Sequence, residues 1–249
     1  MSRILETITA KLRPEVERRK ALCPLASDGF PEIPSFRAAF PGVIAELKKA
    51  SPSKGLIRED FRPVPLALEL EAAGAAALSV LTEPNYFLGS LEYLRAVTAQ
   101  VKIPVLRKEF IFDEYQILEA RHAGAAAVLL IAALLPQAKL VRLAEYAAKL
   151  GLDVLGEAHD AEEVSRLLDS PVTLIGVNAR DLRTFATDIN AVAGLLAPIP
   201  PERLPIAESA ITSAADIRRL REAGAQGFLI GETLMRAPSP GEKLRELLA

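Results

Sequence analysis

The sequence predicts an α/β protein, a (β/α)8 barrel of the TIM-barrel class with an N-terminal helical extension. Eight short apolar segments alternate with eight longer helical segments after residue 42, which is the element count of such a barrel. The chain has 249 residues, and α/β barrels of ~250 residues form single domains. The apolar segments are almost continuously hydrophobic, as parallel strands covered on both faces are. We therefore expect one barrel domain over residues 1–249, with residues 1–42 as its extension.

The extension begins with an amphipathic pattern. Apolar residues recur at helical spacing among charges over Ile4–Arg19, and this spacing predicts a helix. Pro14 falls inside it and predicts a kink or a break, because proline removes a backbone donor and clashes with the preceding turn. A connector rich in proline follows over Leu22–Pro34, and Ser35–Phe40 is expected to form one more helical turn.

The predicted strands are runs of four to six mainly apolar residues. They are Val43–Leu47, Ala77–Leu81, Val105–Lys108, Ala126–Ile131, Asp153–Glu157, Leu174–Asn178, Leu204–Glu208 and Gly227–Ile230. An open doubly wound sheet is the rival arrangement. It would place a G-x-G-x-x-G turn after the first strand, whereas Ser51–Gly55 reads S-P-S-K-G.

Helical segments separate these strands. They are Val64–Ala73, Ser90–Val101, Asp113–Ala123, Leu135–Leu150, Ala161–Leu168, Asn190–Leu196, Ser213–Ala223 and Gly241–Leu248. Three of them close on the phrase Ala-Gly-Ala, with glycine at residues 74, 124 and 224. Glycine accepts the left-handed conformation that ends a helix, so a short turn should lead into the next strand.

Composition indicates a small-molecule partner. The formal net charge is −2, and the charges of both signs are interleaved, which gives no sign of nucleic-acid or membrane binding. Cys23 is the only cysteine, which excludes an internal disulfide framework and a multi-cysteine metal site. No apolar run reaches the ~18 residues of a membrane span, and no signal peptide is recognised. We expect a cytoplasmic protein.

Polar residues end five of the strands. Glu46 and Lys48 lie two residues apart and therefore on one face of their strand, where a structural ion pair and a functional pair are equally open. The strand ends that carry such residues meet at one rim of a barrel, where catalytic side chains of this fold lie. Lysines and glutamates crowded there should shift one another's pKa values, which favours proton-transfer chemistry. The candidates are Glu46, Lys48, Lys108, Glu157, Asn178 and Glu208.

The last two strand ends suggest a phosphate site. Barrels of this class often bind phosphate after strands 7 and 8, at the N-terminus of a short extra helix. Ser209 and Ala210 follow strand 7, while Gly231 and Glu232 precede a short helical segment. Backbone N–H groups could hold a phosphate there, and Glu232 could help only through its backbone. A plain turn capped by Thr233 is the alternative.

Five other residues are less informative. His122 is expected to be a surface or packing histidine, and His159 a loop histidine in a hydrogen bond, with a place at the barrel mouth as its alternative. Cys23 has no basic neighbour close in sequence and is expected to be inert. Phe87, with Tyr86 before it, either walls a substrate ring or packs a loop.

Five blocks resemble the indole-3-glycerol phosphate synthases of tryptophan biosynthesis. They are V-I-A-E-L-K-K-A-S-P-S-K-G, S-V-L-T-E-P-N-Y-F-L-G-S-L-E, V-L-R-K-E-F-I-F-D-E-Y-Q, G-V-N-A-R-D-L-R-T-F and F-L-I-G-E-T-L-M-R-A. The resemblance implies a cofactor-free ring closure of 1-(2-carboxyphenylamino)-1-deoxyribulose 5-phosphate, with loss of CO2 and water. We expect a monomer without a metal, and association with other tryptophan-pathway enzymes is the alternative.

The resemblance also assigns roles to residues. Lys108 matches the family's general acid and Glu157 its acid/base partner. Lys48, paired with Glu46, would either face the substrate carboxylate or assist dehydration. Asn178 and Glu208 complete the polar shell. The substrate-contacting positions, including those for phosphate and the anthranilate ring, fall on Ser51, Phe87, Leu129, Ile131, Arg180, Ser209, Ala210, Gly231 and Glu232.

Some positions depart from the family pattern. Ala210 stands where the family has glycine, Ala179 where it has asparagine, and Glu109 where it has aspartate. Ala210 would resist a positive φ or the close approach of a phosphate.

Two rival functions remain. Phosphoribosylanthranilate isomerases resemble this chain less, since they have cysteine and aspartate where Glu46 and Asn178 stand. A non-catalytic barrel would not keep a charged mouth.

Overall fold

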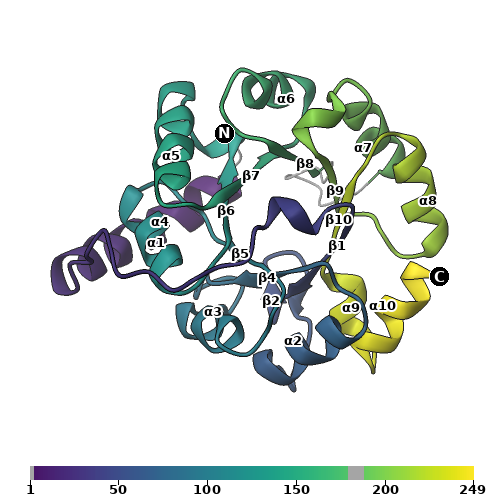
Figure 1. Cartoon of the computed structure of the whole chain (residues 1–249), viewed down its shortest axis with the longest axis horizontal. Helices are drawn as coiled ribbons and strands as arrows, with labels where there is room; N and C mark the ends of the chain where they lie inside the picture. The colour runs from purple at the N-terminus through teal and green to yellow at the C-terminus, as the bar shows by residue number, and fades with distance from the viewer. Residues whose placement is uncertain (1–2, 179–187) are drawn as a thin grey trace.

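The predicted barrel is present. The computed structural model describes residues 3–178 and 188–249, and at its centre eight parallel strands close into a barrel (Figure 1). These strands are β1 (Gly42–Leu47), β4 (Ala77–Leu81), β5 (Val105–Lys108), β6 (Ala127–Ile131), β7 (Asp153–Ala158), β8 (Leu174–Asn178), β9 (Pro205–Glu208) and β10 (Gly227–Ile230). Each pairs with its neighbours in sequence, and β1 closes the ring against β10. The fold class is confirmed, and every strand agrees with its predicted range to within one residue.

The strand register places the polar strand ends at one level. Glu157 of β7 pairs with Ile131 of β6, and Asn178 of β8 pairs with Glu208 of β9. Lys108 of β5 pairs with Leu81 of β4. Since parallel strands all run in one direction, these residues meet at the carboxyl rim of the barrel.

Helices surround the strands (Figure 1). They are α2 (Pro63–Ala72), α3 (Leu91–Thr98), α4 (Glu114–His122), α5 (Gln137–Lys149), α6 (Ala161–Leu168), α7 (Ile189–Leu196), α8 (Ala214–Glu222), α9 (Glu232–Arg236) and α10 (Pro240–Leu248). Side chains of Ser or Asp cap the amino ends of α3, α4, α6, α7, α8 and α10. Gly74, Gly124 and Gly224 all have positive φ just after a helix, as the Ala-Gly-Ala phrases predict. In the described residues no helix is long and apolar enough to cross a membrane.

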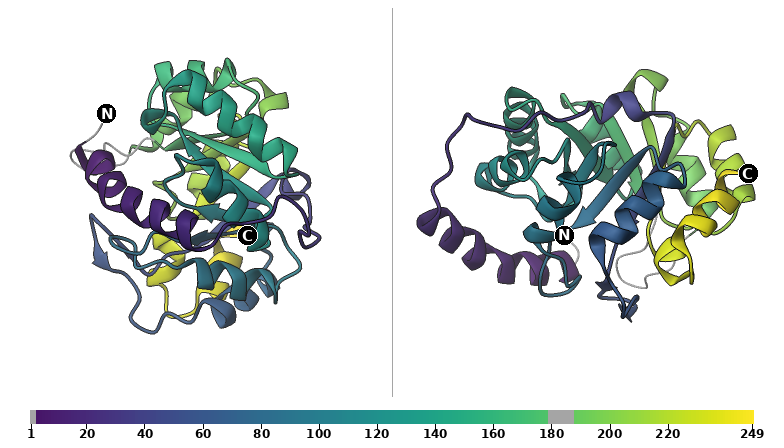
Figure 2. Two further views of the ribbon diagram at one scale, coloured as in Figure 1. Left: turned by 90° about the vertical axis from the view of Figure 1, so that its left-hand side faces the viewer. Right: turned by 60° about the horizontal axis from the view of Figure 1, so that its bottom comes forward.

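The N-terminal extension forms one long helix, α1 (Arg3–Leu22). Of the kink or break expected at Pro14, the break does not occur, because the helix runs through this residue. Leu12 and Val16 on either side are fully buried, so packing of this face outweighs the hydrogen bond that proline removes. Helix α1 is not part of the ring of helices that surrounds the strands, and it contacts α4 (Figure 2). The expected turn after the connector is the 3-10 turn Arg37–Ala39.

Candidate active site

A cavity of about 490 Å³ opens at the carboxyl rim of the barrel. All the sequence-predicted site residues that the structure describes line it. They are Glu46, Lys48, Ser51, Phe87, Lys108, Leu129, Ile131, Glu157, Asn178, Glu208, Ser209, Ala210, Gly231 and Glu232. Arg180 and Ala179 lie outside the described residues. The rim therefore brings together side chains that are up to 186 positions apart, from residue 46 to residue 232.

Lys108 lies between two carboxylates. Its Nζ is 2.6 Å from Oε2 of Glu157 and 3.5 Å from Oε2 of Glu208. The Lys108 side chain is 13% exposed and the two glutamates are almost fully buried. The two glutamates thus hold the ammonium in place, and Lys108 itself lines the cavity.

The charges set the protonation states of this group. Burial alone would lower the pKa of the Lys108 ammonium, but the carboxylates around it, led by Glu157 and Glu208, outweigh burial and raise it. Burial also acts to raise the pKa of Glu157, yet Lys108 and His159 hold it well below its ordinary value. Burial, with the nearby charge of Glu157, raises the pKa of Glu208 to about 8 despite Lys108. Two neighbouring carboxyls thus differ in acidity because their environments differ.

Glu208 has a further sign of being protonated. Its Oε1 is buried and has no hydrogen-bond partner among the described residues. This oxygen lies against Gly176, where any Cβ would collide with it. An ionised oxygen without a partner is costly to bury, whereas a neutral carboxyl is much less so.

Glu46 and Lys48 form the ion pair that their spacing suggests. Lys48 Nζ lies 2.5 Å from Glu46 Oε1, with side-chain exposures of 16% and 4%. Gly231 lies against both groups, and a Cβ there would collide with the Glu46 carboxylate. Both residues line the cavity, so the ammonium of Lys48 is directed to the site and is not merely a surface charge.

A polar chain links the end of the cavity near β9 to Glu157. The hydroxyl of Ser209 donates to Oδ1 of Asn178 at 2.5 Å, and Nδ2 of Asn178 donates to Oε1 of Glu157 at 3.3 Å. Asn178 cannot rotate without breaking one of these bonds. The amide therefore fixes the Glu157 carboxylate from the side opposite Lys108.

The end of the cavity near β9 and α9 is suited to an anion. Gly231 is the N-cap of α9, and no side chain caps the backbone N–H groups there. The hydroxyl of Thr233 instead donates to the Ile211 carbonyl at 2.7 Å. The alternative of a turn capped by Thr233 is therefore wrong, and the helix N-terminus faces the cavity. Ser209 and Ala210 both have positive φ, 71° and 59°.

Two cations that the sequence reasoning missed flank Glu232. Nε of Arg236 lies 2.9 Å from its carboxylate and Nζ of Lys54 lies 3.9 Å from it. Burial acts to raise the pKa of Glu232, but these cations hold it below its ordinary value. They offset the repulsion that its carboxylate would exert on a bound phosphate. The sequence signal was an i,i+4 pair of opposite charges on α9.

Apolar residues form the wall of the cavity opposite its β9–α9 end. Phe87 and Phe110, whose ring centroids lie 5.9 Å apart, flank it together with Leu129 and Ile131. Glu83 fixes the loop that carries Phe87, because its carboxylate accepts from the backbone of Asn85, Tyr86 and Phe87. Tyr86 does not line the cavity and lies under Lys11 of α1 instead.

Helix α1 completes this wall. Its residues Ile4, Leu5 and Ile8 line the cavity. Sequence reasoning placed them in an amphipathic helix but did not connect them to the site, because an apolar stripe has the same pattern whether it covers a core or a ligand.

A buried polar cluster supports β5 from behind. Arg107, adjacent to Lys108, is 1% exposed and does not line the cavity. Its guanidinium donates to the Gln116 carbonyl at 2.6 Å, to Thr82 Oγ1 at 3.1 Å and to Glu119 Oε2 at 3.3 Å. Glu119 in turn accepts from Nε of Arg19 in α1 at 2.7 Å.

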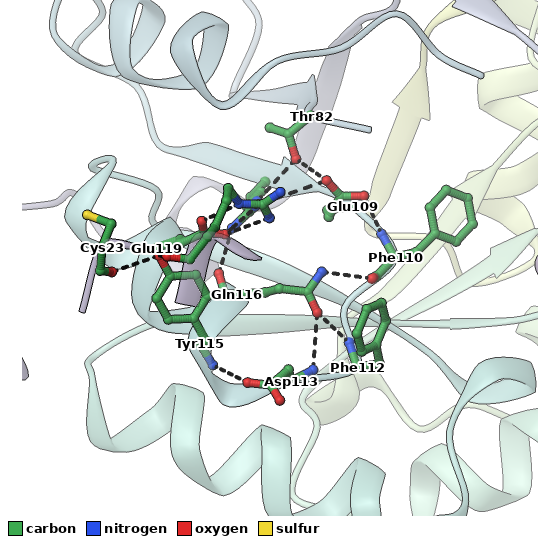
Figure 3. Close-up of polar contacts among 11 residues, drawn as sticks. Cys23, Thr82, Glu109, Phe110, Phe112, Asp113, Tyr115, Gln116 and Glu119 are labelled. Carbon is green, nitrogen blue, oxygen red and sulfur yellow. Dashed lines mark hydrogen bonds and ion pairs between the residues drawn. The ribbon is translucent and has the colours of Figure 1, made fainter. Parts of the chain in front are cut away.

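The same cluster holds the loop after β5. The Gln116 amide donates to the Phe110 carbonyl and accepts from the backbone of Phe112 and Asp113 (Figure 3). Glu109 accepts from Thr82 and from Phe110 N. These bonds fix both Lys108 and Phe110, which face the cavity.

His159 is a loop histidine in a hydrogen bond, as expected, and it also takes the alternative place at the mouth, because it lines the cavity. Its Nε2 lies 3.3 Å from Glu157 Oε1 and its Nδ1 lies 3.0 Å from Glu163 Oε2. His122, in contrast, contacts the Ala26 carbonyl and the Phe30 ring, as a packing histidine would. Cys23 is exposed.

The site can bind a small anionic molecule and move protons on it. One end offers uncapped backbone donors, one wall is apolar, and the floor holds Lys108 with an ionised Glu157. A proton donor and an acceptor 2.6 Å apart can serve successive steps on one substrate. Among the described residues no group of three or more His, Cys, Asp or Glu side chains could hold a metal.

Sequence comparison identifies relatives of the chain. A model of the family "Indole-3-glycerol phosphate synthase" matches residues 5–247. An indole-3-glycerol phosphate synthase of Carboxydothermus hydrogenoformans is 53% identical over 210 residues, which cover 84% of this chain and 79% of that protein.

Structural comparison finds the same fold in more distant proteins. A 3-hexulose-6-phosphate synthase of Salmonella typhimurium superposes with a TM-score of 0.66 at 13% identity, covering 83% of this chain and 96% of that one. A chain of the tryptophan synthase α2β2 complex of Pyrococcus furiosus has a TM-score of 0.61 at 13% identity, covering 84% and 98%. At this identity the likeness concerns the fold alone.

Proposed function

The chain belongs to the indole-3-glycerol phosphate synthase family, and on this premise we propose how its cavity carries out the family's reaction. The substrate is 1-(2-carboxyphenylamino)-1-deoxyribulose 5-phosphate. Its ring closure releases CO2 and water and gives indole-3-glycerol phosphate, a step of tryptophan biosynthesis. The protein is therefore a carboxy-lyase.

One observation carries the mechanism: Lys108 lies in contact with two carboxylates at the floor of an open cavity. Lys108 is the general acid. As the anthranilate ring carbon attacks the ribulose carbonyl, the carbonyl oxygen takes a proton from the Lys108 ammonium. The new carbon–carbon bond makes the carboxylate-bearing ring carbon tetrahedral, and loss of CO2 restores the ring electrons.

Glu157 is the acid/base partner in the loss of water. While Lys108 is charged, it holds the pKa of Glu157 down, so this carboxylate is a weak base. Once Lys108 has given its proton away, that attraction disappears and Glu157 becomes more basic. Ring closure therefore precedes dehydration because the charge of Lys108 controls the basicity of Glu157.

The remaining residues bind and orient the substrate. Backbone groups at Ser209–Ala210 and Gly231–Glu232 hold the phosphate, with Arg180 as a further contact. Phe87, Leu129 and Ile131 enclose the anthranilate ring. The buried hydroxyl of Ser51, which has no hydrogen-bond partner in the described part of the chain, is available to the substrate.

Lys48 has two open roles. Its ammonium, fixed by Glu46, either faces the substrate carboxylate until CO2 leaves or assists dehydration. Asn178 orients Glu157, and Glu208 acts as a neutral neighbour of Lys108. Apart from the carbon–carbon bond formation, in which Lys108 protonates the carbonyl oxygen, each step is a proton transfer or the loss of a small neutral molecule, which these side chains can support. We further propose a monomeric cytoplasmic enzyme with one barrel domain over residues 1–249.

The direct test is turnover. The purified protein is incubated with the anilino-deoxyribulose phosphate, and indole fluorescence and released CO2 are followed together. Equal amounts of both products are expected. A protein that binds the substrate but releases neither product would contradict the proposal.

A further inference from the structure

His159 lies between a proposed catalytic carboxylate and a second carboxylate with no assigned role. It follows β7 directly, and its side chain is 11% exposed. Glu157 belongs to β7, while Glu163 stands in the first turn of α6. The imidazole therefore bridges the end of the strand and the start of the next helix.

Glu163 holds the imidazole in one orientation. Its Oε2 accepts from the backbone N–H of His159 at 2.8 Å and lies 3.0 Å from Nδ1 of the same residue. A carboxylate only accepts, so Nδ1 must carry a proton. The Asp160 side chain caps α6 by accepting from Glu163 N, and the helix N-terminus stabilises the carboxylate of Glu163.

The other imidazole nitrogen faces Glu157. Nε2 is buried, makes no hydrogen bond to any described residue, and lies 3.3 Å from Glu157 Oε1. That oxygen also accepts from Asn178, while Oε2 is engaged by Lys108. A small closure of the site would turn the Nε2 contact into a hydrogen bond, as happens often when a substrate binds.

We propose that His159, clamped by Glu163, is a positioning residue that keeps Oε1 of Glu157 engaged so that Oε2 stays directed at Lys108 and the substrate. The inference rests on the proposed role of Glu157. When Lys108 gives up its proton, the Lys108–Glu157 attraction is lost at the moment when Glu157 has to act. His159 then holds the carboxylate in place.

The charge balance supports this role. The charged groups in contact with His159 are Glu157 of β7 and Glu163 of α6. Glu157 is in turn paired with Lys108 of β5, and the backbone N–H of Glu163 donates to Asp160, the N-cap of α6. Burial acts to lower the pKa of His159, but Glu157 and Glu163 outweigh it and raise the pKa to about 10. The imidazole is therefore a cation throughout neutral pH, with a proton on each nitrogen.

Proton NMR tests the clamp without any turnover. The chain has two histidines, so His122→Gln leaves the ring signal of His159 alone. We expect that signal not to titrate between about pH 6 and pH 8. Glu163→Gln should lower its midpoint by a unit or more, while Glu162→Gln, exposed in the same helical turn, should not. A midpoint near the ordinary value of about 6.5 in the parent would overturn the inference.

Kinetics tests the positioning. His159→Gln should lower kcat between about 10-fold and 100-fold with little change in KM, because misplaced reacting groups cost rate. It should also move the acidic limb of the kcat profile to higher pH, since Glu157 loses a nearby cation. Glu163→Gln should cause a smaller shift of the same sign.

The two proposals fail in different ways. Unchanged kcat and pH profile in His159→Gln, with full activity of the parent, would overturn the positioning role alone. An inactive parent would overturn the proposed function, and the NMR result would still decide whether the clamp exists. Glu162→Gln serves as the control in the kinetic series as well.

Discussion

Lys108 and Glu157 form a buried ion pair, with 2.6 Å between Nζ and Oε2 and side-chain exposures of 13% and 6%. They come from β5 and β7, which are not adjacent in the barrel. The pair therefore reaches past β6 rather than joining neighbouring strands. Because this geometry presents an acid and a base to one substrate, it is the first relationship to test.

Lys108→Ala should abolish turnover while the barrel stays folded. The variant removes the proton donor and leaves Glu157 and Glu208 without their shared cation. Indole fluorescence measures activity, and circular dichroism measures folding. The control is Lys102→Ala, since Lys102 is exposed. Parent-like activity in Lys108→Ala would exclude Lys108 as the general acid.

Glu157→Gln should bind substrate but turn it over ~10²-fold or more slowly, as loss of general acid–base help typically does. Glutamine keeps the size of the side chain and can still accept from Lys108, so KM should change little. Steady-state kinetics gives both constants. A large rise in KM with unchanged kcat would instead indicate a binding role for Glu157.

Glu208 makes the stability of the protein depend on pH. Its folded-state pKa of about 8 lies above its ordinary value of 4.5. The folded carboxyl thus holds its proton more tightly than the unfolded one. This contribution to stability is complete below about pH 4.5 and is lost as the pH rises through about 8.

The Glu208→Gln variant lacks this titration. Urea unfolding at pH 5 and pH 9 should show a smaller loss of unfolding free energy on the alkaline side than in the parent. Exposed Glu202→Gln should match the parent. Equal pH dependence in Glu208→Gln and the parent would mean that this carboxyl ionises at its ordinary pKa.

The sequence could predict the barrel and the composition of its mouth for a physical reason. Parallel strands in a closed ring all end at one rim, so a polar residue ending a strand has its place fixed by topology. Lys108 and Asn178 needed no further information to be assigned to one cavity. The glycines that follow three helices were likewise predictable, because the left-handed conformation that ends a helix favours glycine.

Other features depend on packing that no local pattern encodes. The apolar residues of α1 show helical spacing, but nothing in that spacing says that Ile4 and Ile8 face a cavity. Pro14 favours a break, and burial of Leu12 and Val16 overrides it. His159 is a loop histidine in a hydrogen bond, as the sequence predicts, but its approach to Glu157 at the cavity depends on how the end of β7 and the start of α6 are placed.

Arg107→Met should destabilise the protein by about 3–5 kcal/mol, the usual result of removing one partner from a buried ion pair. Glu119 and Glu109 would stay buried with one cation fewer. Urea unfolding measures the change. Arg142→Met removes an exposed pair with Glu114 and should cost less than about 1 kcal/mol. Similar losses in both variants would show that the buried cluster adds nothing beyond a surface pair.

Ala210→Gly should make the protein more stable and its phosphate site tighter. Ala210 has a φ of 59°, a left-handed conformation that costs an L-residue with a Cβ roughly 1–2 kcal/mol and costs glycine much less. The variant relieves this strain and removes the methyl group beside the proposed phosphate site, so unfolding free energy should rise by about 1 kcal/mol and KM should fall. Ala237, with a φ of −68°, provides the matched control, because glycine there only adds freedom to the unfolded chain and should destabilise. If Ala210→Gly loses stability as Ala237→Gly does, the left-handed conformation of Ala210 carries no strain. Alanine in place of the family's glycine would then have no consequence for the site.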